Sequence, residues 1–183
     1  EDPLLALHPT SLGPNSLDDL LGFIGGICRC ALDPSNEALF TLATQTLILL
    51  HDPPNIRLWS MEGVNLIETF WKVSSDVNEA IAKALLQARE MRSADFLMMI
   101  TLLQEILQKR NDFLASYSGD IRPSAAFEKV RSNTLKELEV ALLVCLCSSK
   151  VKIISKCAAC FHLLCKEAQI VDMTLEQAPN NTI

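Results

Sequence analysis

The clearest pattern in the chain is a pair of apolar segments, residues 134–147 and 150–168, that only Ser148 and Ser149 separate. In the first segment, hydrophobic residues recur at helical spacing on one face: Leu135, Leu138, Leu142, Cys145 and Leu146. The opposite face is apolar as well, with Val140, Leu143, Val144 and Cys147. This pattern predicts a helix that is buried on nearly all sides.

The second segment predicts an amphipathic helix. Its apolar stripe consists of Ile154, Cys157, Phe161, Leu164, Cys165 and Ala168. Another stripe is basic and consists of Lys152, Lys156, His162 and Lys166. Because the connection is so short, the two helices must fold back on each other as an antiparallel hairpin, the building unit of helical-repeat proteins. Ser148 or Ser149 is expected to cap the second helix.

The rest of the chain predicts four more helices and no strands. We expect a glycine-containing helix over residues 17–31, and a second helix that starts at Asp33 and Pro34 and reaches about His51. An irregular link through Trp59 follows, and then two longer helices over residues 64–90 and 93–117. The inward residues of these two helices are Ile67, Phe70, Ser74, Val77, Ile81 and Leu85, and Phe96, Met99, Ile100, Leu103, Ile106, Leu107 and Leu114.

Together the helices predict an all-α fold, a HEAT/armadillo-like α-solenoid of antiparallel helix pairs. Residues 1–15 are rich in proline and glycine and predict an irregular lead-in. Residues 16–172 form the helical-repeat domain, and residues 173–183 a polar tail. We also interpret the start at Glu1, without a methionine, as a sign that the chain is part of something longer.

Composition narrows the range of functions. The formal charge of −6 and the few aromatic residues argue against nucleic-acid binding, which needs a basic surface and stacking side chains. Seven cysteines is an odd number, and most of them fall in helical apolar patterns, so we expect free thiols in a reducing, cytoplasmic compartment. No apolar run approaches the roughly twenty residues of a membrane span, and no signal peptide is evident.

Candidate metal ligands are concentrated in the last predicted helix. Cys157, Cys160, His162 and Cys165 include a CxxC spacing, but a zinc site takes its ligands from loops and needs a matching second pair. The cysteines fall on the predicted core stripe, whereas His162 points away from it. The CxC pairs Cys28/Cys30 and Cys145/Cys147 diverge around a helix. We therefore expect no metal and no other cofactor, and interpret the cysteines as core residues.

We find no catalytic constellation. His8, His51 and His162 are scattered, none of them beside a glycine-flanked serine or cysteine, and each is expected to be a cap or a surface residue. Gly22, Gly25 and Gly26 do not form a phosphate loop, because no Lys-Ser/Thr follows them. We expect the chain not to be an enzyme. The Phe70-Trp71 pair is expected to be core packing rather than a binding anchor.

The basic stripe is the one candidate binding surface. On an acidic chain, Lys152, Lys156, His162 and Lys166 could dock an acidic partner segment or an anionic lipid head group. The alternative is an ordinary solvated helix face.

Five groups of strings follow one another along the chain: Leu49-Leu50-His51 with Leu58-Trp59, Glu68-Thr69-Phe70-Trp71 with Ser74-Ser75, Glu105-Ile106-Leu107 with Arg110-Asn111 and Phe113-Leu114, Leu138-Glu139-Val140-Ala141-Leu142, and Cys160-Phe161 with Leu164-Cys165 and Glu167-Ala168. Taken in this order, they resemble the neurofibromin/Ira family of very large Ras GTPase-activating proteins. The resemblance covers roughly residues 38 to 170 and lies in the helical-repeat region that precedes the catalytic domain of that family. Between Leu114 and Thr134 the family carries a longer Cys- and Ser-rich insertion, whereas this chain has a short link.

The resemblance implies a non-catalytic scaffold segment of a negative regulator of Ras signalling. The arginine finger and the Phe-Leu-Arg signature of the GTPase-activating domain are missing, since Ala115 follows Phe113-Leu114. The implied partners are neighbouring helical repeats of the parent chain and a second copy through the helical arms, with Ras engaged only by the separate catalytic domain. Peripheral membrane association would then come through the parent protein.

Two other interpretations stay open. One is a free-standing helical adaptor that binds a peptide or a helix in a groove and is unrelated to Ras. The other is a thiol-rich metal or redox module, which zinc analysis would test.

Overall fold

Seven helices make up the part of the chain that the computed structural model describes, residues 16–60, 63–87 and 92–177, with side chains through Met173. They are α2 (Leu17–Ala31), α3 (Glu37–Leu50), α4 (Pro53–Arg57), α5 (Leu66–Gln87), α6 (Ser93–Ser116), α7 (Ala125–Leu146) and α8 (Val151–Gln177). These residues contain no strand, so the predicted all-α class is confirmed.

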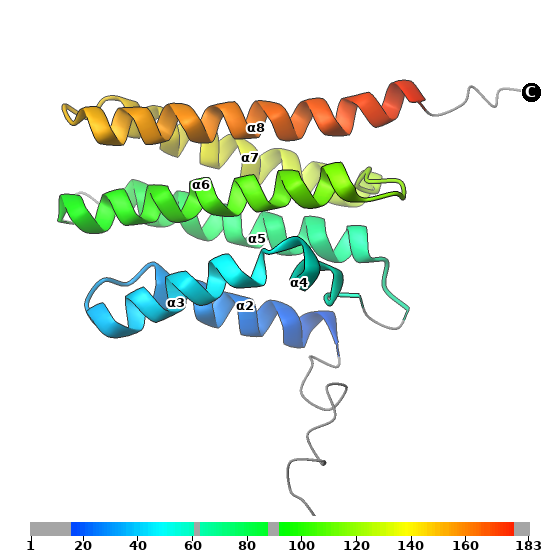
Figure 1. Ribbon diagram of the computed structural model, residues 1–183, viewed down its shortest axis with the longest axis horizontal. Helices are drawn as coiled ribbons and strands as arrows, with labels where there is room; N and C mark the ends of the chain where they lie inside the picture. The colour runs from blue at the N-terminus through cyan, green and yellow to red at the C-terminus, as the bar shows by residue number, and fades with distance from the viewer. Residues whose placement is uncertain (1–15, 61–62, 88–91, 178–183) are drawn as a thin grey trace, which may run out of the picture.

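The six long helices form two layers of three (Figure 1). One layer contains α2, α5 and α7, and the other contains α3, α6 and α8. Within a layer the helices run in the same direction, and the two layers run in opposite directions. α5 packs most extensively on α7, and α6 on α8, while α2 pairs with α3 across the layers. The result is three helix pairs stacked side by side.

Several helix ends follow the sequence signals. α2 has the predicted bounds, and Ser16 caps it by accepting a hydrogen bond from the backbone N–H of Asp19 at 3.1 Å. Ser148 accepts a hydrogen bond from the backbone N–H of Lys150 at 3.2 Å, just before α8. The tight connection therefore reverses the chain between α7 and α8, as predicted.

Other boundaries differ from the prediction. α3 begins at Glu37 rather than after Asp33, because the Asn36 side chain caps it by accepting from the N–H of Leu39 at 3.1 Å. Residues 53–57, expected to be irregular, form the short helix α4, since proline is well suited to a first helical turn. α6 begins at Ser93, the predicted first residue, with Arg92 as its N-cap residue.

The last two helices are longer than the apolar segments that predicted them. α7 begins at Ala125, nine residues before Thr134, and α8 continues to Gln177, into the segment predicted as a polar tail. The predictions for residues 1–15 and 178–183 lie outside the described residues.

The core lies between the two layers. The inward stripes of α5 and α6 are confirmed: all of their predicted residues are buried except Phe96, which is half-buried. Trp71 is also fully buried, and its indole N–H donates to the carbonyl oxygen of Ile121 at 2.8 Å. The prediction that Phe70 and Trp71 are core residues is therefore confirmed.

The prediction for α7 is wrong. Val140, Leu143 and Val144 are exposed by 53–56 %, so α7 buries only one face. Its neighbours in the described structure are α5 and α8, and two helices cannot cover a third on all sides. The predicted stripe of α8 is also shifted: Cys165 and Ala168 are exposed, and Ile153, Cys160 and Leu163 are buried instead.

None of the helices in the described residues combines the length and apolar character that crossing a membrane requires.

Candidate functional site

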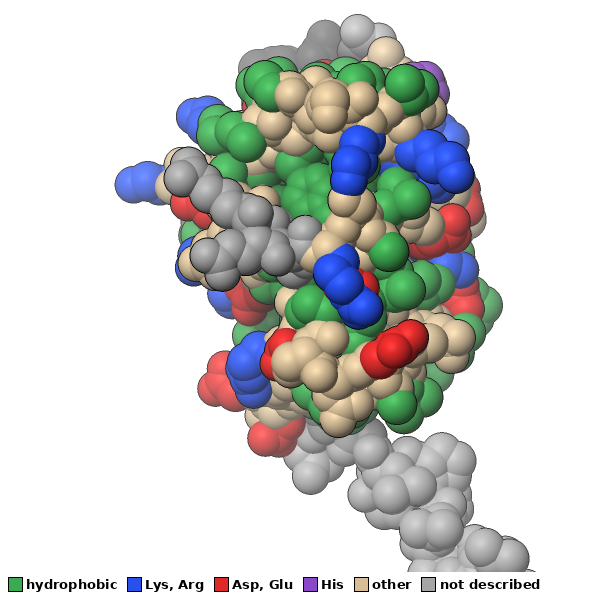
Figure 2. All heavy atoms as spheres, turned by 90° about the vertical axis from the view of Figure 1, so that its left-hand side faces the viewer, with side chains coloured by type: hydrophobic (Ala, Val, Ile, Leu, Met, Phe, Trp, Pro, Cys, Tyr) green, Lys and Arg blue, Asp and Glu red, His purple; other side chains and the backbone are tan. Residues whose placement is uncertain are grey.

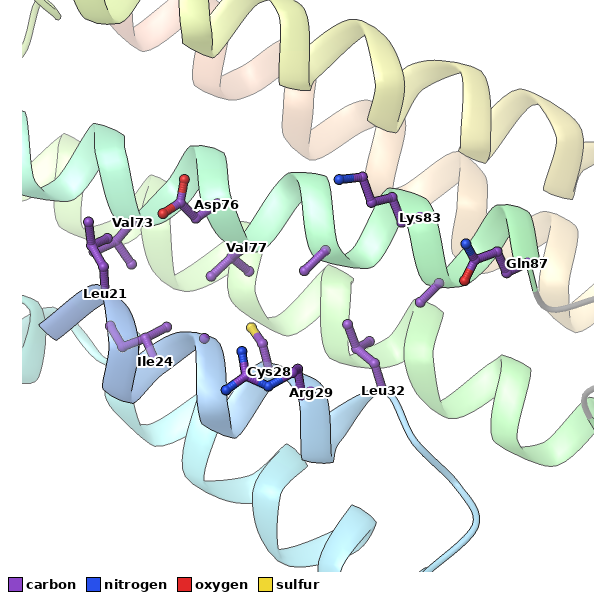
Figure 3. Close-up of a pocket in the computed structure, with 13 residues that line it drawn as sticks. Leu21, Ile24, Cys28, Arg29, Leu32, Val73, Asp76, Val77, Lys83 and Gln87 are labelled. Carbon is purple, nitrogen blue, oxygen red and sulfur yellow. The ribbon is translucent and has the colours of Figure 1, made fainter. Parts of the chain in front are cut away.

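A groove runs between α2 and α5 on the surface of the first layer (Figure 3). It has a volume of about 480 Å³. α2 lines it with Leu21, Ile24, Gly25, Cys28, Arg29 and Leu32, and α5 lines it with Val73, Asp76, Val77, Ala80, Lys83, Ala84 and Gln87. Most of these side chains are apolar, so the groove has an apolar floor with a few charged groups at its edges.

Small residues keep the groove open. Gly25 on α2 and Ala80 and Ala84 on α5 line the groove, and none of the three has a side chain long enough to fill it. A Cβ atom built on Gly25 would meet only the guanidinium of Arg29, at 3.9 Å. α2 and α5 also pack less extensively than α5 and α7 do. The groove therefore reflects the choice of residues on the two facing helices.

The charged groups at the edge of the groove differ in their partners. Asp76 pairs with Lys72 at 2.8 Å, and Lys83 pairs with Glu79 one turn away. Arg29 is exposed and makes no hydrogen bond or ion pair within residues 16–60, 63–87 and 92–173. Arg29 is thus the cation of the groove that remains available to a ligand.

Cys28 forms part of the apolar floor and not a reactive centre. Burial raises the pKa of its thiol to about 12, an effect that the positive charge of Arg29 opposes and the carboxylate of Asp76 reinforces. The thiol is therefore protonated at neutral pH. A protonated buried thiol behaves as a small hydrophobic group.

The predicted basic stripe lies along α8. Lys152, His162 and Lys166 are exposed, whereas Lys156 is half-buried and donates to Oε1 of Gln104 on α6 at 2.8 Å. The structure therefore leaves three of the four side chains accessible and uses the fourth to connect two helices. Whether the stripe binds a partner stays a prediction.

A second, shallower hollow of about 430 Å³ opens at the end of the molecule where α6 and α8 begin. Leu86, Phe96 and Val144 line it together with Lys150. Figure 2 looks onto this end and shows hydrophobic side chains at the surface among charged ones. The hollow lies at the loop ends of two helix pairs, and the described residues that line it include no unpaired buried polar group.

The candidate metal ligands of α8 are not brought together. Cys157 and Cys160 are buried, while His162 and Cys165 are exposed. The described residues contain no group of three His, Cys, Asp or Glu side chains that could hold a metal ion. Both CxC pairs diverge: Cys28 and Cys145 are buried, Cys30 is half-buried and Cys147 is exposed.

The buried thiols of α7 and α8 contact each other and the backbone. A hydrogen bond with Cys157 raises the pKa of Cys145 and lowers that of Cys157, and burial raises the pKa of Cys160 to about 12. The Cys160 thiol also lies 3.8 Å from the carbonyl oxygen of Ile100. These contacts link α7 to α8 and α8 to α6.

His51 is a core residue rather than a surface one. The sequence predicted either a cap or a surface position for this residue. His51 is the C-cap residue of α3, but it is fully buried. Its Nδ1 lies 2.8 Å from the carbonyl oxygen of Leu47, and its ring packs edge-on against Trp59. Nε2 has no hydrogen-bond partner among the residues that the structure describes, and burial lowers the pKa of the imidazole to about 4. His8 lies outside the described residues.

Sequence analysis missed a buried polar network that joins α5, α6 and α8. Arg110 donates from Nη1 to Oδ1 of Asn78 at 2.8 Å, and its Nη2 lies 2.9 Å from both carboxylate oxygens of Glu167. Its guanidinium also lies 5.9 Å from the ring centre of Phe70. Next to it, Asn111 donates to the carbonyl oxygen of Leu163 at 2.9 Å. The signal in the sequence was spacing, since Arg110 and Asn111 fall between Leu107 and Leu114 at inward-facing positions of the helix.

The residues that carry the family resemblance meet in this network. Phe70, Arg110, Asn111 and Glu167 come from three of the similar strings, and all four are buried. No model of a known protein family matches the chain. These four residues are part of the core, whereas Leu49, Leu58 and Val140, from other similar strings, are exposed.

Proposed function

We propose that this chain is a non-catalytic scaffold segment of a neurofibromin/Ira-type Ras GTPase-activating protein, built as a HEAT/armadillo-like solenoid. The observation that carries the proposal is the stack of three helix pairs, whose buried junction contains Arg110 and Glu167, residues of two of the similar strings. In repeat proteins each unit contacts its neighbours and stacking buries a continuous core. The packing of α5 on α7 and of α6 on α8 supports this proposal, because each helix contacts its counterpart in the next pair.

A scaffold role also agrees with the placement of the arginines. Stabilising a transferred phosphoryl group requires an arginine presented into another protein's site. Arg110 is buried in the core, Arg92, Arg122 and Arg131 each pair with a neighbouring carboxylate, and Arg57 donates to Ser116. Arg29 is the exception among the described arginines, because it is exposed and has no ion pair there. In the proposed parent the GTPase-activating domain, separate from this segment, would engage Ras, and this segment would position that domain in the cytoplasm.

The proposed partners follow from this role. Further helical repeats of the parent chain would pack on the exposed apolar residues of the two outer helix pairs, and self-association would involve the helical arms. Leu42 on α3 and Leu143 on α7 are exposed by 61 % and 55 % and are suited to such packing.

The test is the native size of the protein that carries this segment, measured by immunoblot with an antibody against residues 16–173. The expected result is a band of several hundred kilodaltons whose immunoprecipitate accelerates GTP hydrolysis on Ras, while the 20.2-kDa chain alone does not. A band near the mass of the chain itself would contradict the proposal.

A second candidate is a helical adaptor unrelated to Ras, which the groove between α2 and α5 favours. The same immunoblot separates the two, because an adaptor requires neither a large parent nor Ras activity in the precipitate.

A further inference from the structure

We propose that the groove between α2 and α5 docks an amphipathic α-helix of a partner protein, one that carries an apolar stripe flanked by acidic side chains. The inference concerns a surface that the scaffold role does not use. It holds whether or not the parent acts on Ras.

The dimensions of the groove fit a short helix. Its lining extends from Leu21 to Leu32 along α2 and from Val73 to Gln87 along α5. At about 1.5 Å per residue, these walls are roughly 16 to 21 Å long, which matches three to four turns of an α-helix. An occupant of that length could place an apolar side chain on the floor at each turn.

The walls favour a helix over an extended peptide. Both are α-helices whose central backbone groups are hydrogen-bonded within the helix, so the groove offers no row of free N–H and C=O groups to an added strand. An extended segment would leave its own backbone groups unpaired against an apolar floor. A helix satisfies those groups internally and presents only side chains.

The small residues permit close contact. Gly25, Ala80 and Ala84 lie along the groove, and nothing except the Arg29 side chain approaches a Cβ atom placed on Gly25. A partner helix can therefore approach both walls and bury its stripe against Ile24, Val73 and Val77.

The charged groups at the groove determine which charge the side chains of a partner helix should carry. Asp76 and Lys83 already have partners on α5, in Lys72 and Glu79, whereas Arg29 has none among the described side chains. A carboxylate on the docked helix would form a charge-assisted hydrogen bond with the guanidinium. A basic helix would instead place like charges side by side.

The experiment is a selection from a displayed library of helical peptides on the full 183-residue chain, with removal of clones that also bind Gly25→Leu. Leucine at position 25 fills the groove, while Gly22→Leu serves as the matched control, because Gly22 lies on the same helix in open space and outside the groove. Both substitutions replace a helix glycine with a better helix former. Circular dichroism confirms that each variant is folded.

Enriched peptides are expected to carry apolar residues at helical spacing next to Asp or Glu. By fluorescence anisotropy, such a peptide should lose at least tenfold in affinity for Gly25→Leu and for Arg29→Glu, and keep its affinity for Gly22→Leu. Exchanging its acidic residues for lysine should restore binding to Arg29→Glu.

Three results would overturn the proposal. One is the absence of any clone whose binding depends on Gly25, and another is equal affinity for wild type and Arg29→Glu. The third is a tenfold gain in affinity when Leu4, Leu5 and Leu7 are replaced by serine. That gain would mean that the first residues of the chain itself compete for the groove, so that its occupant is not a partner protein.

Discussion

At the scale of single residues, the most consequential feature is a charged pair inside the core. Arg110 and Glu167 are 1 % and 2 % exposed, on α6 and α8. Burial lowers the pKa of Arg110, and the carboxylate of Glu167 acts in the opposite direction. An arginine remains protonated in spite of such burial, so both charges persist and depend on each other. The pair fixes which turn of α8 lies beside which turn of α6.

Removing one member of the pair should be costly. Glu167→Gln leaves the Arg110 charge without its counter-ion, and Arg110→Met does the same to Glu167, so each is expected to lower the free energy of unfolding by about 3–5 kcal/mol. The double variant should lose less than the sum of the two, which urea titration followed by circular dichroism would measure. Additive losses would show that the two side chains do not act as a pair.

His51 makes the stability depend on pH. Its imidazole has a pKa of about 4 in the folded chain against 6.5 in the unfolded chain, so the unfolded state binds more protons between these values. The contribution of His51 to the free energy of unfolding is fully present above about pH 6.5 and decreases as the pH falls toward 4. The expected loss is about 3 kcal/mol, at 1.36 kcal/mol for each pKa unit.

The measurement is the free energy of unfolding from pH 7 to 4 for wild type and His51→Gln. The variant should show a smaller decrease, because it cannot take up the proton, whereas His162→Gln, at an exposed position, should follow wild type. Equal slopes for wild type and His51→Gln would contradict the prediction.

At the scale of elements, α2 shows that local sequence signals set the bounds of a helix while its packing neighbours stabilise it. Its bounds agree with the prediction because Ser16 caps its first turn and its apolar residues recur at helical spacing. Its three glycines weaken it locally, yet Leu20, Ile24 and Cys28 are buried and anchor it to the core. Tertiary packing thus holds a helix that its own propensity supports poorly.

Alanine at two of these glycines should stabilise the protein. Gly22 lies in open space and Gly25 has no atom within 3.9 Å of an added Cβ, so each Gly→Ala change is expected to raise the free energy of unfolding by about 0.5–1 kcal/mol. Gly63 is the contrasting position, because its φ of 77° is unfavourable for other residues, and alanine there should cost about 1 kcal/mol. Thermal and urea unfolding would measure all three, and destabilisation by Gly22→Ala would contradict the argument.

At the scale of the whole molecule, the two outer helix pairs expose apolar side chains. α3 exposes Leu39, Leu42 and Leu49 by 46, 61 and 57 %, and α7 exposes Val140, Leu143 and Val144 by similar fractions. Exposed apolar patches of this kind promote association. In a stack of helix pairs, such surfaces are where a further pair would pack.

The isolated chain should therefore associate at high concentration. Glutamate at Leu42 and Leu143 is expected to reduce the association seen by sedimentation velocity, and to change the free energy of unfolding by no more than about 0.5 kcal/mol, since both side chains are exposed. Met98→Glu is the control, because Met98 is 37 % exposed on the central pair. A wild-type chain that stays monomeric over the whole concentration range would contradict this prediction.

The sequence by itself determined the helices and much of what lies inside them. Helical periodicity placed the inward stripes of α5 and α6, and the serine pair at 148–149 predicted the reversal between α7 and α8. Local signals failed where two neighbouring residues could play the same role. Asn36 rather than Asp33 caps α3, and the two prolines begin the short helix α4 instead of starting an irregular link. Helix periodicity, caps and tight turns depend on contacts between residues close in the chain, so the linear sequence contains most of the information about them.

Only the tertiary structure decided what each apolar face meets. α7 is apolar on two faces, and the sequence could not show that one of them has no neighbour in the described structure. The pairing of Arg110 with Glu167, 57 residues apart, and the groove between α2 and α5 likewise arise from helices distant in the chain. Periodicity reports the direction in which a side chain points on its own helix. The partner it reaches depends on how the helices stack.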